Sequence, residues 1–307
     1  MMESVASGSA AHGARRSRAG ALGADERAGD PRTRPVGVFD SGVGGLVVLH
    51  ELLVRLPHED FLYIGDTARF PYGERSPQEL VSFAAEIAEE LLAHRAKLLV
   101  VACNSATSAA LPSLSARMME TTLGVDVLGV VRPEAFQAVA ATRSGRIGLL
   151  ATPTTVASGA YLEAVAAVDP HVTLHSVACP ELASIIEAGR QFDEHAVASV
   201  REACAPLRRE GVDTVILGCT HYPLIQPMLQ RILGPSVTLI SSGAALARQV
   251  EHALSTRGLQ NPRDGEGDYR FLCTGDAEAF RERGTRFLQM PLGEVERIEL
   301  AGARAVA

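Results

Sequence analysis

Two cysteines occupy matching places in the sequence and carry its most reactive chemistry. Cys103 and Cys219 each follow four apolar residues of a predicted strand and precede a predicted helix start. A thiol at a helix N-terminus has a lowered pKa, because the helix dipole and the free N–H groups favour the thiolate. We therefore interpret this pair as reactive. We expect Cys179, Cys204 and Cys273 to pack in the interior, although Cys179 precedes a proline turn that could face the same site.

Two thiols on opposite sides of one ligand can invert a stereocentre. The thiolate takes a proton from carbon while the thiol returns a proton to the opposite face, and the two exchange roles with direction. This chemistry requires neither a redox cofactor nor a metal. It requires that the two cysteines reach the ligand from two facing parts of the chain.

The elements that position these cysteines repeat along the sequence. From residue 35 onward, short apolar strands alternate with helices, which predicts an α/β fold with mostly parallel sheets flanked by helices. Strands predicted to begin at 36, 61, 98 and 125 recur at 147, 172, 214 and 237. Regular strand spacing occurs in any parallel α/β protein, but the matching loop cysteines favour a duplication. We predict two similar lobes related by a pseudo-twofold axis, with the site between them at the carboxyl ends of the strands.

The predicted boundaries follow from this repeat. The first lobe comprises residues 35–130 and 240–300, because a strand over 269–274, a helix from Asp276 and a strand over 295–300 complete it. The second lobe comprises residues 131–239. Residues 1–34 contain no apolar segment of a secretory signal, and we predict disordered tails over 1–34 and 301–307.

Composition excludes several classes of protein. The 307 residues are 47% hydrophobic and carry a net charge of −7, with a mean hydropathy of +0.11 and a pI near 5.7. We expect neither a membrane span nor a nucleic-acid partner. The single lysine, Lys97, excludes pyridoxal-phosphate catalysis unless it is itself the nucleophile. An odd number of cysteines without a C-x-x-C pair is typical of reduced thiols in a cytoplasmic protein rather than of disulfides or zinc.

Four segments of the sequence carry a family resemblance. They are Asp40-Ser41-Gly42-Val43-Gly44-Gly45-Leu46, Gly65-Asp66-Thr67-Ala68-Arg69 leading to Pro71-Tyr72-Gly73, Ala102-Cys103-Asn104-Ser105-Ala106, and Gly218-Cys219-Thr220-His221-Tyr222-Pro223-Leu224. In this order they resemble glutamate racemases, within the aspartate/glutamate racemase family, over roughly residues 36–300. The last segment is highly specific and favours glutamate over aspartate. The resemblance implies cofactor-independent interconversion of L- and D-glutamate, which supplies peptidoglycan synthesis and hence the bacterial cell wall and cell shape.

The resemblance also implies roles for individual residues. Cys103 resembles the base that acts on D-glutamate, and Cys219 the base that acts on L-glutamate. Asp40 matches an assisting carboxylate and His221 an assisting imidazole. The positions that match substrate contacts are Asp40, Ser41, Tyr72, Gly73, Asn104, Ser105, Thr152, Thr155, Thr220 and His221. Glutamate is the implied small-molecule partner, with no cofactor, no metal and a homodimeric assembly.

Other interpretations of the same residues stay open at this point. A thiol hydrolase would use Cys219 as nucleophile and His221 as base, but it leaves Cys103 without a role. A non-catalytic effector would bind another protein through the same surface. Asp40-Ser41-Gly42 occurs once and leads into a helix, unlike an aspartic-protease turn, and the glycine-rich turn lacks the lysine of a phosphate-binding loop. A thiolate is a strong base only when water is excluded, so we expect the lobes to close over the substrate.

Overall fold

The computed structural model describes residues 29–122 and 124–300, so most of the predicted N-terminal tail and all of the C-terminal one lie outside the described residues. The chain divides into two units, Met1–Asp30 and Pro31–Ala307, and the fold described here is that of the second. Within the range predicted as tail, residues Pro31–Thr33 form a short 3-10 helix. The ammonium of Lys97 is buried, and it donates to the Arg32 carbonyl and to Glu59, each at 2.5 Å. Residues 31–34 therefore belong to the folded unit, because a buried ammonium needs such acceptors.

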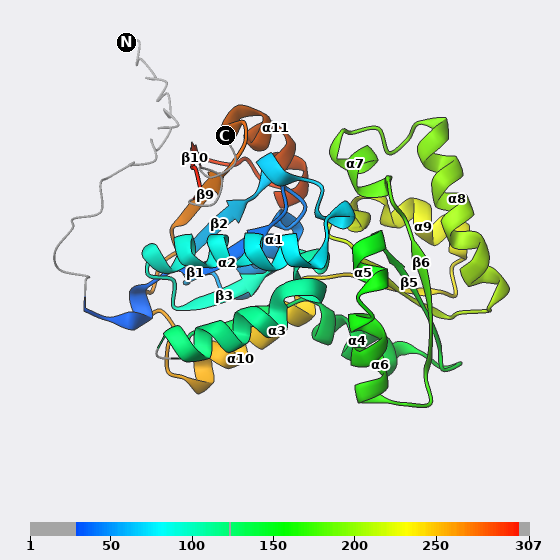
Figure 1. The fold of residues 1–307 in the computed structure, drawn as a ribbon, viewed down its shortest axis with the longest axis horizontal. Helices are drawn as coiled ribbons and strands as arrows, with labels where there is room; N and C mark the ends of the chain where they lie inside the picture. The colour runs from blue at the N-terminus through cyan, green and yellow to red at the C-terminus, as the bar shows by residue number, and fades with distance from the viewer. Residues whose placement is uncertain (1–28, 123, 301–307) are drawn as a thin grey trace, which may run out of the picture. The chain divides into compact units, whose positions relative to one another are not determined.

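Two sheets of parallel strands form the centre of this unit (Figure 1). In sheet order, the first consists of β10 (Val295–Arg297), β9 (Tyr269–Cys273), β2 (Phe61–Gly65), β1 (Val36–Asp40), β3 (Leu98–Val101) and β4 (Asp126–Gly129). The second consists of β6 (Thr173–Ala178), β5 (Arg146–Ala151), β7 (Thr214–Gly218) and β8 (Thr238–Ile240). The order β2-β1-β3-β4 recurs as β6-β5-β7-β8, so β3 and β7 are equivalent strands. The predicted α/β fold with two similar sheets is confirmed.

Helices cover both faces of the first sheet. Those on one face are α1 (Leu46–Arg55), α10 (Ala244–Thr256) and α11 (Ala277–Leu288), and those on the other are α2 (Pro77–Ala93) and α3 (Asn104–Thr121). Successive side chains of β1 point to opposite faces, so Val38 packs with the first group and Phe39 with the second. Helix α2 begins with a capping box, in which the Ser76 hydroxyl accepts from the Glu79 N–H and the Glu79 carboxylate accepts from the Ser76 N–H.

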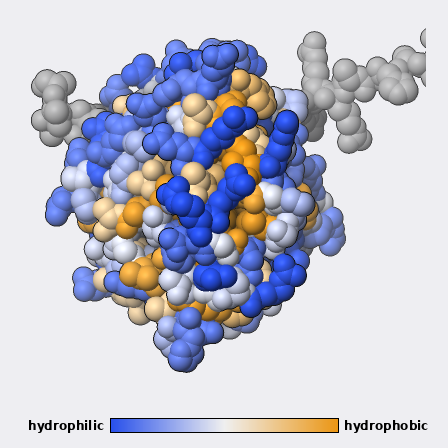
Figure 2. Space-filling model, turned by 90° about the vertical axis from the view of Figure 1, so that its right-hand side faces the viewer, coloured by the Kyte–Doolittle hydropathy of each residue, from blue (hydrophilic) through white to orange (hydrophobic). Residues whose placement is uncertain are grey.

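The second sheet is covered in the same way. Helices α4 (Val131–Ala141) and α6 (Ala160–Val168) share a core with Ile147, Leu149 and Ile216, whereas α8 (Glu194–Arg209) and α9 (Gln226–Leu233) pack against Val215 and Leu217 on the other face. The shorter helices are α5 (Pro153–Ala157), α7 (Leu182–Glu187), and the 3-10 helices η2 (Thr67–Arg69), η3 (Tyr72–Glu74) and η4 (Tyr222–Ile225). Hydrophilic side chains dominate the surface in Figure 2, and apolar ones lie between them in small groups.

The chain passes between the two lobes twice. The first connection lies between β4 and α4, at Val130, and the second lies between β8 and α10, over residues 241–243. Both connections lie where a strand ends, so the edge that carries the carboxyl ends of the strands is also where the lobes meet. Among the described residues, none of the helices is both long and apolar enough to cross a membrane.

Candidate active site between the two lobes

The two predicted reactive cysteines lie at equivalent strand ends and line one cavity. Cys103 follows β3 and is the N-cap of α3, and Cys219 follows β7. The cavity has a volume of about 20 Å³, and the side chains of both cysteines are buried. A volume of this size holds about one water molecule. The structure is thus a closed form, in which the lobes leave little space between the thiols.

The helix starts after the two cysteines differ. Helix α3 begins directly at Asn104, as predicted, whereas after Cys219 the chain makes a turn, then the 3-10 helix η4, and α9 begins only at Gln226. Pro223 and Pro227 have no N–H group, so this segment forms short helices in place of one continuous helix. A helix does follow Cys219, as predicted, but it begins several residues later than the prediction placed it.

Asp40 connects the glycine-rich turn to the second lobe. It ends β1 and is fully buried; its Oδ2 accepts from the Gly42 N–H at 3.0 Å, and its Oδ1 accepts from the Thr220 hydroxyl at 3.4 Å. Burial raises the pKa of this carboxyl, and the neighbouring His221 opposes the rise. Gly44 of the same turn approaches the second lobe so closely that a Cβ there would lie 2.3 Å from the Thr220 hydroxyl. The glycine is therefore required for the lobes to meet.

Cys103 does not have the lowered pKa that its place at a helix N-terminus predicts. Burial raises the pKa of its thiol, and the negative charge of Asp40 raises it further. The Ala106 N–H and the Ser41 hydroxyl, 3.8 Å from Sγ, act in the opposite direction but are outweighed. The prediction is wrong for this residue in the closed form, because desolvation exceeds the effect of the helix terminus. The Cys103 sulfur is a protonated thiol here.

His221 lies between Cys219 and a carboxylate. Its Nδ1 is 3.8 Å from the Cys219 sulfur, and its Nε2 is 2.8 Å from Oε2 of Glu187 on α7. Burial lowers the pKa of His221, but the hydrogen bonds to Cys219 and Glu187 outweigh burial and raise it to about 10. His221 is therefore an imidazolium at neutral pH, and both ring nitrogens donate.

Two aromatic rings enclose this imidazolium. The ring centroids of Phe70 and Phe287 lie 5.6 Å and 5.2 Å from that of His221. Phe287, on α11, is fully buried, and Phe70 lines the cavity. The rings keep water from the pair that His221 forms with Glu187, and the exclusion of water strengthens the attraction between the two charges.

Hydroxyl groups join the lobes on the other side of the cavity. Ser105, at the start of α3, is 2.9 Å from the Thr152 hydroxyl and 3.2 Å from that of Thr155, and the two threonine hydroxyls are 2.9 Å apart. Thr152 is also the N-cap of α5. The backbone at Gly73 passes so close to Thr152 that a Cβ would lie 2.6 Å from it. These small side chains form a compact polar wall.

The structure brings all the predicted site residues together. Those that line the cavity are Ser41, Tyr72, Gly73, Cys103, Asn104, Ser105, Thr152, Cys219, Thr220 and His221. Asp40 and Thr155 lie behind the lining and bond to it. The hydroxyl of Tyr72 donates to Asp66, so Tyr72 turns its ring rather than a free hydroxyl to the cavity. Of the remaining cysteines, Cys179 does not line the cavity, and burial raises its pKa to about 12 and that of Cys204 to about 11.

Several residues of the site were not found from the sequence. Phe70 lines the cavity but is not among the residues predicted for the site. Glu187 lies 34 residues before His221, at the end of an ordinary helical stretch, and no motif marks it. Glu134, which accepts from the Asn104 side chain, follows a proline in another such stretch. Only the folded chain reveals these partners.

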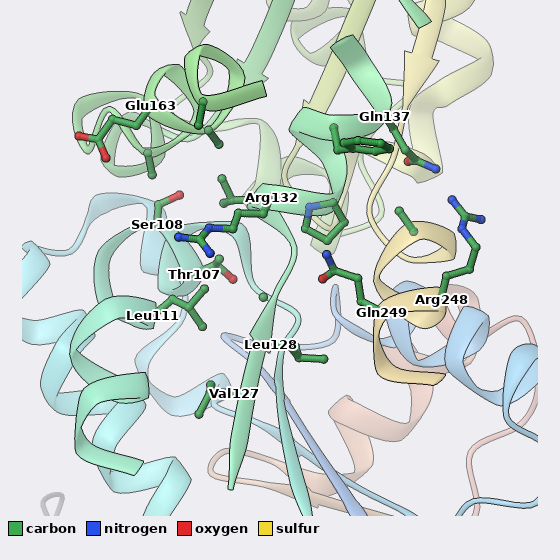
Figure 3. A pocket seen from close by; sticks show the side chains of 18 of the residues that line it. Thr107, Ser108, Leu111, Val127, Leu128, Arg132, Gln137, Glu163, Arg248 and Gln249 are labelled. Atoms are coloured by element: carbon green, nitrogen blue, oxygen red, sulfur yellow. The ribbon is translucent and has the colours of Figure 1, made fainter. Parts of the chain in front are cut away.

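A second, larger hollow lies away from the thiols. It has a volume of about 1380 Å³ and is lined by residues of α3, β4, α4, α6 and α10, among them Arg132, Glu163 and Arg248 (Figure 3). None of the described residues that line it is a cysteine, so the two-thiol chemistry belongs to the smaller cavity. The residues that the structure describes hold no cluster of three or more His, Cys, Asp or Glu side chains that could bind a metal ion.

Comparison with known proteins gives a consistent result. A family model described as Asp/Glu/Hydantoin racemase matches residues 49–250. Glutamate racemase of Acidothermus cellulolyticus is 43% identical over 265 residues, which cover 86% of this chain and 98% of that protein. The structure of a glutamate racemase from Bacillus anthracis superimposes with a TM-score of 0.82 at 38% identity, over 88% of this chain and 98% of that one. The glutamate racemase of Francisella tularensis, solved in complex with D-glutamate, gives 0.81 at 31% identity, over 88% and 99%. The family model covers most of the chain, and the similar proteins match it over nearly their whole length. Together with the two thiols at equivalent strand ends, these matches show that the chain belongs to the aspartate/glutamate/hydantoin racemase family.

Proposed function

We propose that this protein interconverts L- and D-glutamate by a two-base mechanism in which Cys219 and Cys103 act on opposite faces of the α-carbon. One observation carries the proposal: the ends of the equivalent strands β3 and β7 bring one thiol from each lobe to the same closed cavity. Each thiol is buried and lies close to a different assisting group, Asp40 for Cys103 and His221 for Cys219. The glutamate racemases of similar sequence and structure support glutamate as the substrate.

The two thiols have different neighbours. Nδ1 of His221 lies 3.8 Å from the Cys219 sulfur, whereas burial and Asp40 raise the pKa of Cys103 and keep it a thiol. In the proposed forward reaction Cys219 removes the α-proton of L-glutamate, while the Cys103 thiol delivers a proton to the opposite face and D-glutamate forms. In the reverse direction Cys103 is the base and Cys219 the acid.

Neutral groups hold the carboxylates of the substrate in this proposal. The hydroxyls of Ser41, Ser105, Thr152 and Thr220 and the N–H groups at the start of α3 are donors without a positive charge. Donors fixed in a dry cavity stabilise the negative charge that grows on the α-carboxylate as the proton leaves. A lysine or arginine in the cavity is therefore not required.

The lobes must separate for glutamate to reach the thiols. A cavity of about 20 Å³ is far smaller than an amino acid with ten non-hydrogen atoms. We propose that the lobes open about their two connections, at Val130 and at residues 241–243, and close again over the substrate. Small-angle scattering with and without glutamate measures this change, and an identical lobe separation in both states would contradict it.

Deuterium exchange tests the two-base mechanism. In deuterated water, L-glutamate should give D-glutamate that carries deuterium at the α-carbon, while the L-glutamate that remains early in the reaction keeps its hydrogen. Cys103→Ala and Cys219→Ala should each abolish racemisation, with exchange retained only on L-glutamate in the first and only on D-glutamate in the second. Cys204→Ser is the control and should behave as the wild type. Full racemase activity in Cys219→Ala would refute the mechanism.

One contact supports the alternative of a thiol hydrolase. Cys219, His221 and Glu187 form a chain of contacts like that of a nucleophile, its base and the group that orients the base. A hydrolase leaves Cys103 without a role in the same cavity. Cleavage of glutamate esters or amides without exchange of the α-hydrogen would decide for the hydrolase.

The biological role follows from the reaction. D-glutamate is the expected product for peptidoglycan synthesis, and hence for construction of the cell wall. The homodimer and the cytoplasmic location stay predictions, and analytical ultracentrifugation measures the first of them.

A further inference from the structure

A buried carboxyl stands behind the cavity, and the two-thiol chemistry does not use it. Glu134, on α4, is 1% exposed. Its Oε1 accepts a hydrogen bond from the hydroxyl of Ser242, and its Oε2 accepts one from the hydroxyl of Tyr161 on α6. Ser242 lies in the second connection between the lobes. The Glu134 side chain therefore joins α4 of the second lobe to the second connection, and it lies behind Asn104 of the cavity lining.

The remaining contacts of this carboxyl are with the side-chain amide of Asn104. Asn104 Nδ2 donates to the Tyr161 hydroxyl at 2.7 Å and to Oε2 of Glu134 at 3.3 Å. A carboxylate only accepts, and the hydroxyl of Tyr161 has already given its hydrogen to Glu134. Both groups therefore require a donor, so they select the NH₂ side of the amide. The orientation of Asn104 follows from the chemistry of its neighbours.

This orientation leaves the carbonyl oxygen of Asn104 without a donor among its neighbours. Asn104 lines the cavity and is 2% exposed, and its Oδ1 is buried without a hydrogen-bond partner. A buried acceptor without a donor is unfavourable, so it needs an explanation. Glutamate has two carboxylates, which accept, and one ammonium, which is its only strong donor at neutral pH. An acceptor fixed in the wall can thus pair with the ammonium but not with either carboxylate.

We propose that Glu134 is a positioning residue, which holds Asn104 with Oδ1 toward the cavity so that this oxygen accepts a hydrogen bond from the substrate ammonium. The inference rests on the proposed racemase function and deepens it, since it assigns the recognition of one substrate group. Asp40 provides the negative charge for the ammonium, and Asn104 provides a second, directed acceptor. A substrate analogue without the ammonium should not need Glu134.

Calorimetric binding of two ligands tests the inference without requiring turnover. The ligands are DL-glutamate, whose composition racemisation does not change, and glutarate, which lacks the ammonium. Glu134→Gln keeps the size of the side chain but presents both a donor and an acceptor, so it no longer selects one orientation of Asn104. We expect the affinity for glutamate to fall by about tenfold or more, as for other hydrogen bonds to charged groups, with glutarate changed less than about twofold. The measurements are made at about pH 8.5, because burial raises the pKa of Glu134 to about 7.

A matched control and a second variant complete the design. Glu163→Gln makes the same substitution on α6, at an exposed position of the larger hollow (Figure 3), and should bind both ligands as the wild type does. Tyr161→Phe removes the hydroxyl that accepts from Asn104 at 2.7 Å and leaves the amide held by Glu134 alone, at 3.3 Å. It should therefore weaken glutamate selectively, but by less than Glu134→Gln does. If Glu134→Gln does not fold, this variant still tests whether the orientation of Asn104 controls the binding of the substrate ammonium. In turnover, the positioning role predicts a raised KM with kcat changed little, because the ammonium is bound in the ground state and in the transition state alike.

The outcomes separate the inference from the function on which it rests. Equal weakening of glutamate and glutarate in Glu134→Gln, or unchanged affinity for both, overturns the inference, and the racemase proposal stands. Wild-type protein that binds glutamate but does not racemise it overturns the racemase proposal, and the selective loss in the variants still supports the role of Glu134. Wild-type protein that binds glutarate but not glutamate overturns both.

Discussion

The contact between the glycine-rich turn and the second lobe allows a sharp test of the closed form. In Gly44→Ala, the new Cβ would lie 2.3 Å from Oγ1 of Thr220, 2.6 Å from Cε1 of His221 and 2.7 Å from its Nδ1. Ordinary contacts begin at 3.4 Å, so the lobes must separate by about 1 Å at this point. His221 cannot retreat, because Glu187 and Phe287 hold it from behind.

The expected consequence is a loss of activity without a loss of the fold. A displacement of about 1 Å between reacting groups costs about a hundredfold in rate, so we expect kcat/KM of Gly44→Ala to fall by about that factor. Circular dichroism follows the reaction from either enantiomer. Because the equilibrium constant of a racemisation is one, kcat/KM must fall equally in the two directions, which checks the data internally.

A second glycine provides the control for this experiment. A Cβ at Gly293 would have no neighbour within 4 Å, so Gly293→Ala should keep the activity of the wild type. Thermal unfolding of both variants shows whether the fold is intact. If Gly44→Ala retained kcat/KM to within about threefold with an unchanged unfolding temperature, the reaction would not require this approach of the lobes, and the reasoning would be wrong.

Two further predictions concern stability. The pKa of His221 is about 10 in the folded protein, above its unfolded value near 6.5, so its pairing contributes stability that is fully present below about pH 6.5 and is lost as the pH rises through about 10. Glu187→Gln should therefore lower the free energy of unfolding by about 3 kcal/mol at pH 6, as measured by urea denaturation, and by less toward pH 10; an equal difference at both pH values would contradict this. Cys204→Ser places a hydroxyl at a fully buried position of α8 and should cost about 1–3 kcal/mol while leaving kcat unchanged, which unfolding and turnover measurements check together.

The sequence predicted the fold and the site where local patterns are strong. Alternation of apolar strands with helices placed the start of each strand to within about one residue, because strands buried on both faces of a parallel sheet are continuously apolar. The last strand ends earlier than predicted, at Arg297. The helix predicted from Asp276 begins there for a similarly local reason, because the Asp276 side chain accepts from the Ala279 N–H as the N-cap. The loops after equivalent strands brought the two cysteines to one cavity as predicted, since parallel strands end at one edge of their sheet.

The rest depends on neighbours that are distant in the sequence. The pKa of Cys103 follows from its burial and from Asp40, which lies 63 residues earlier and reaches it only in the folded chain. Glu187 and Glu134 carry no motif, and each has a function only through the partner that the fold places against it. A carboxylate in an ordinary helix gives no sequence signal of a buried pair. Electrostatic environments of this kind cannot be deduced from local patterns.

The pairing of β9 with β2 has a consequence for how the chain acquires its structure during synthesis. Phe61 is paired with Tyr269, so more than two hundred residues separate partners in the first sheet, whereas all four strands of the second sheet lie between residues 146 and 240. During synthesis on the ribosome, the second lobe can therefore complete its sheet before β9, the partner of β2, has been synthesised. Until β9 emerges, β2 presents an unpaired edge to other nascent chains. We expect this strand to be the place where a chaperone, or a misassembled second copy, first binds the unfinished protein.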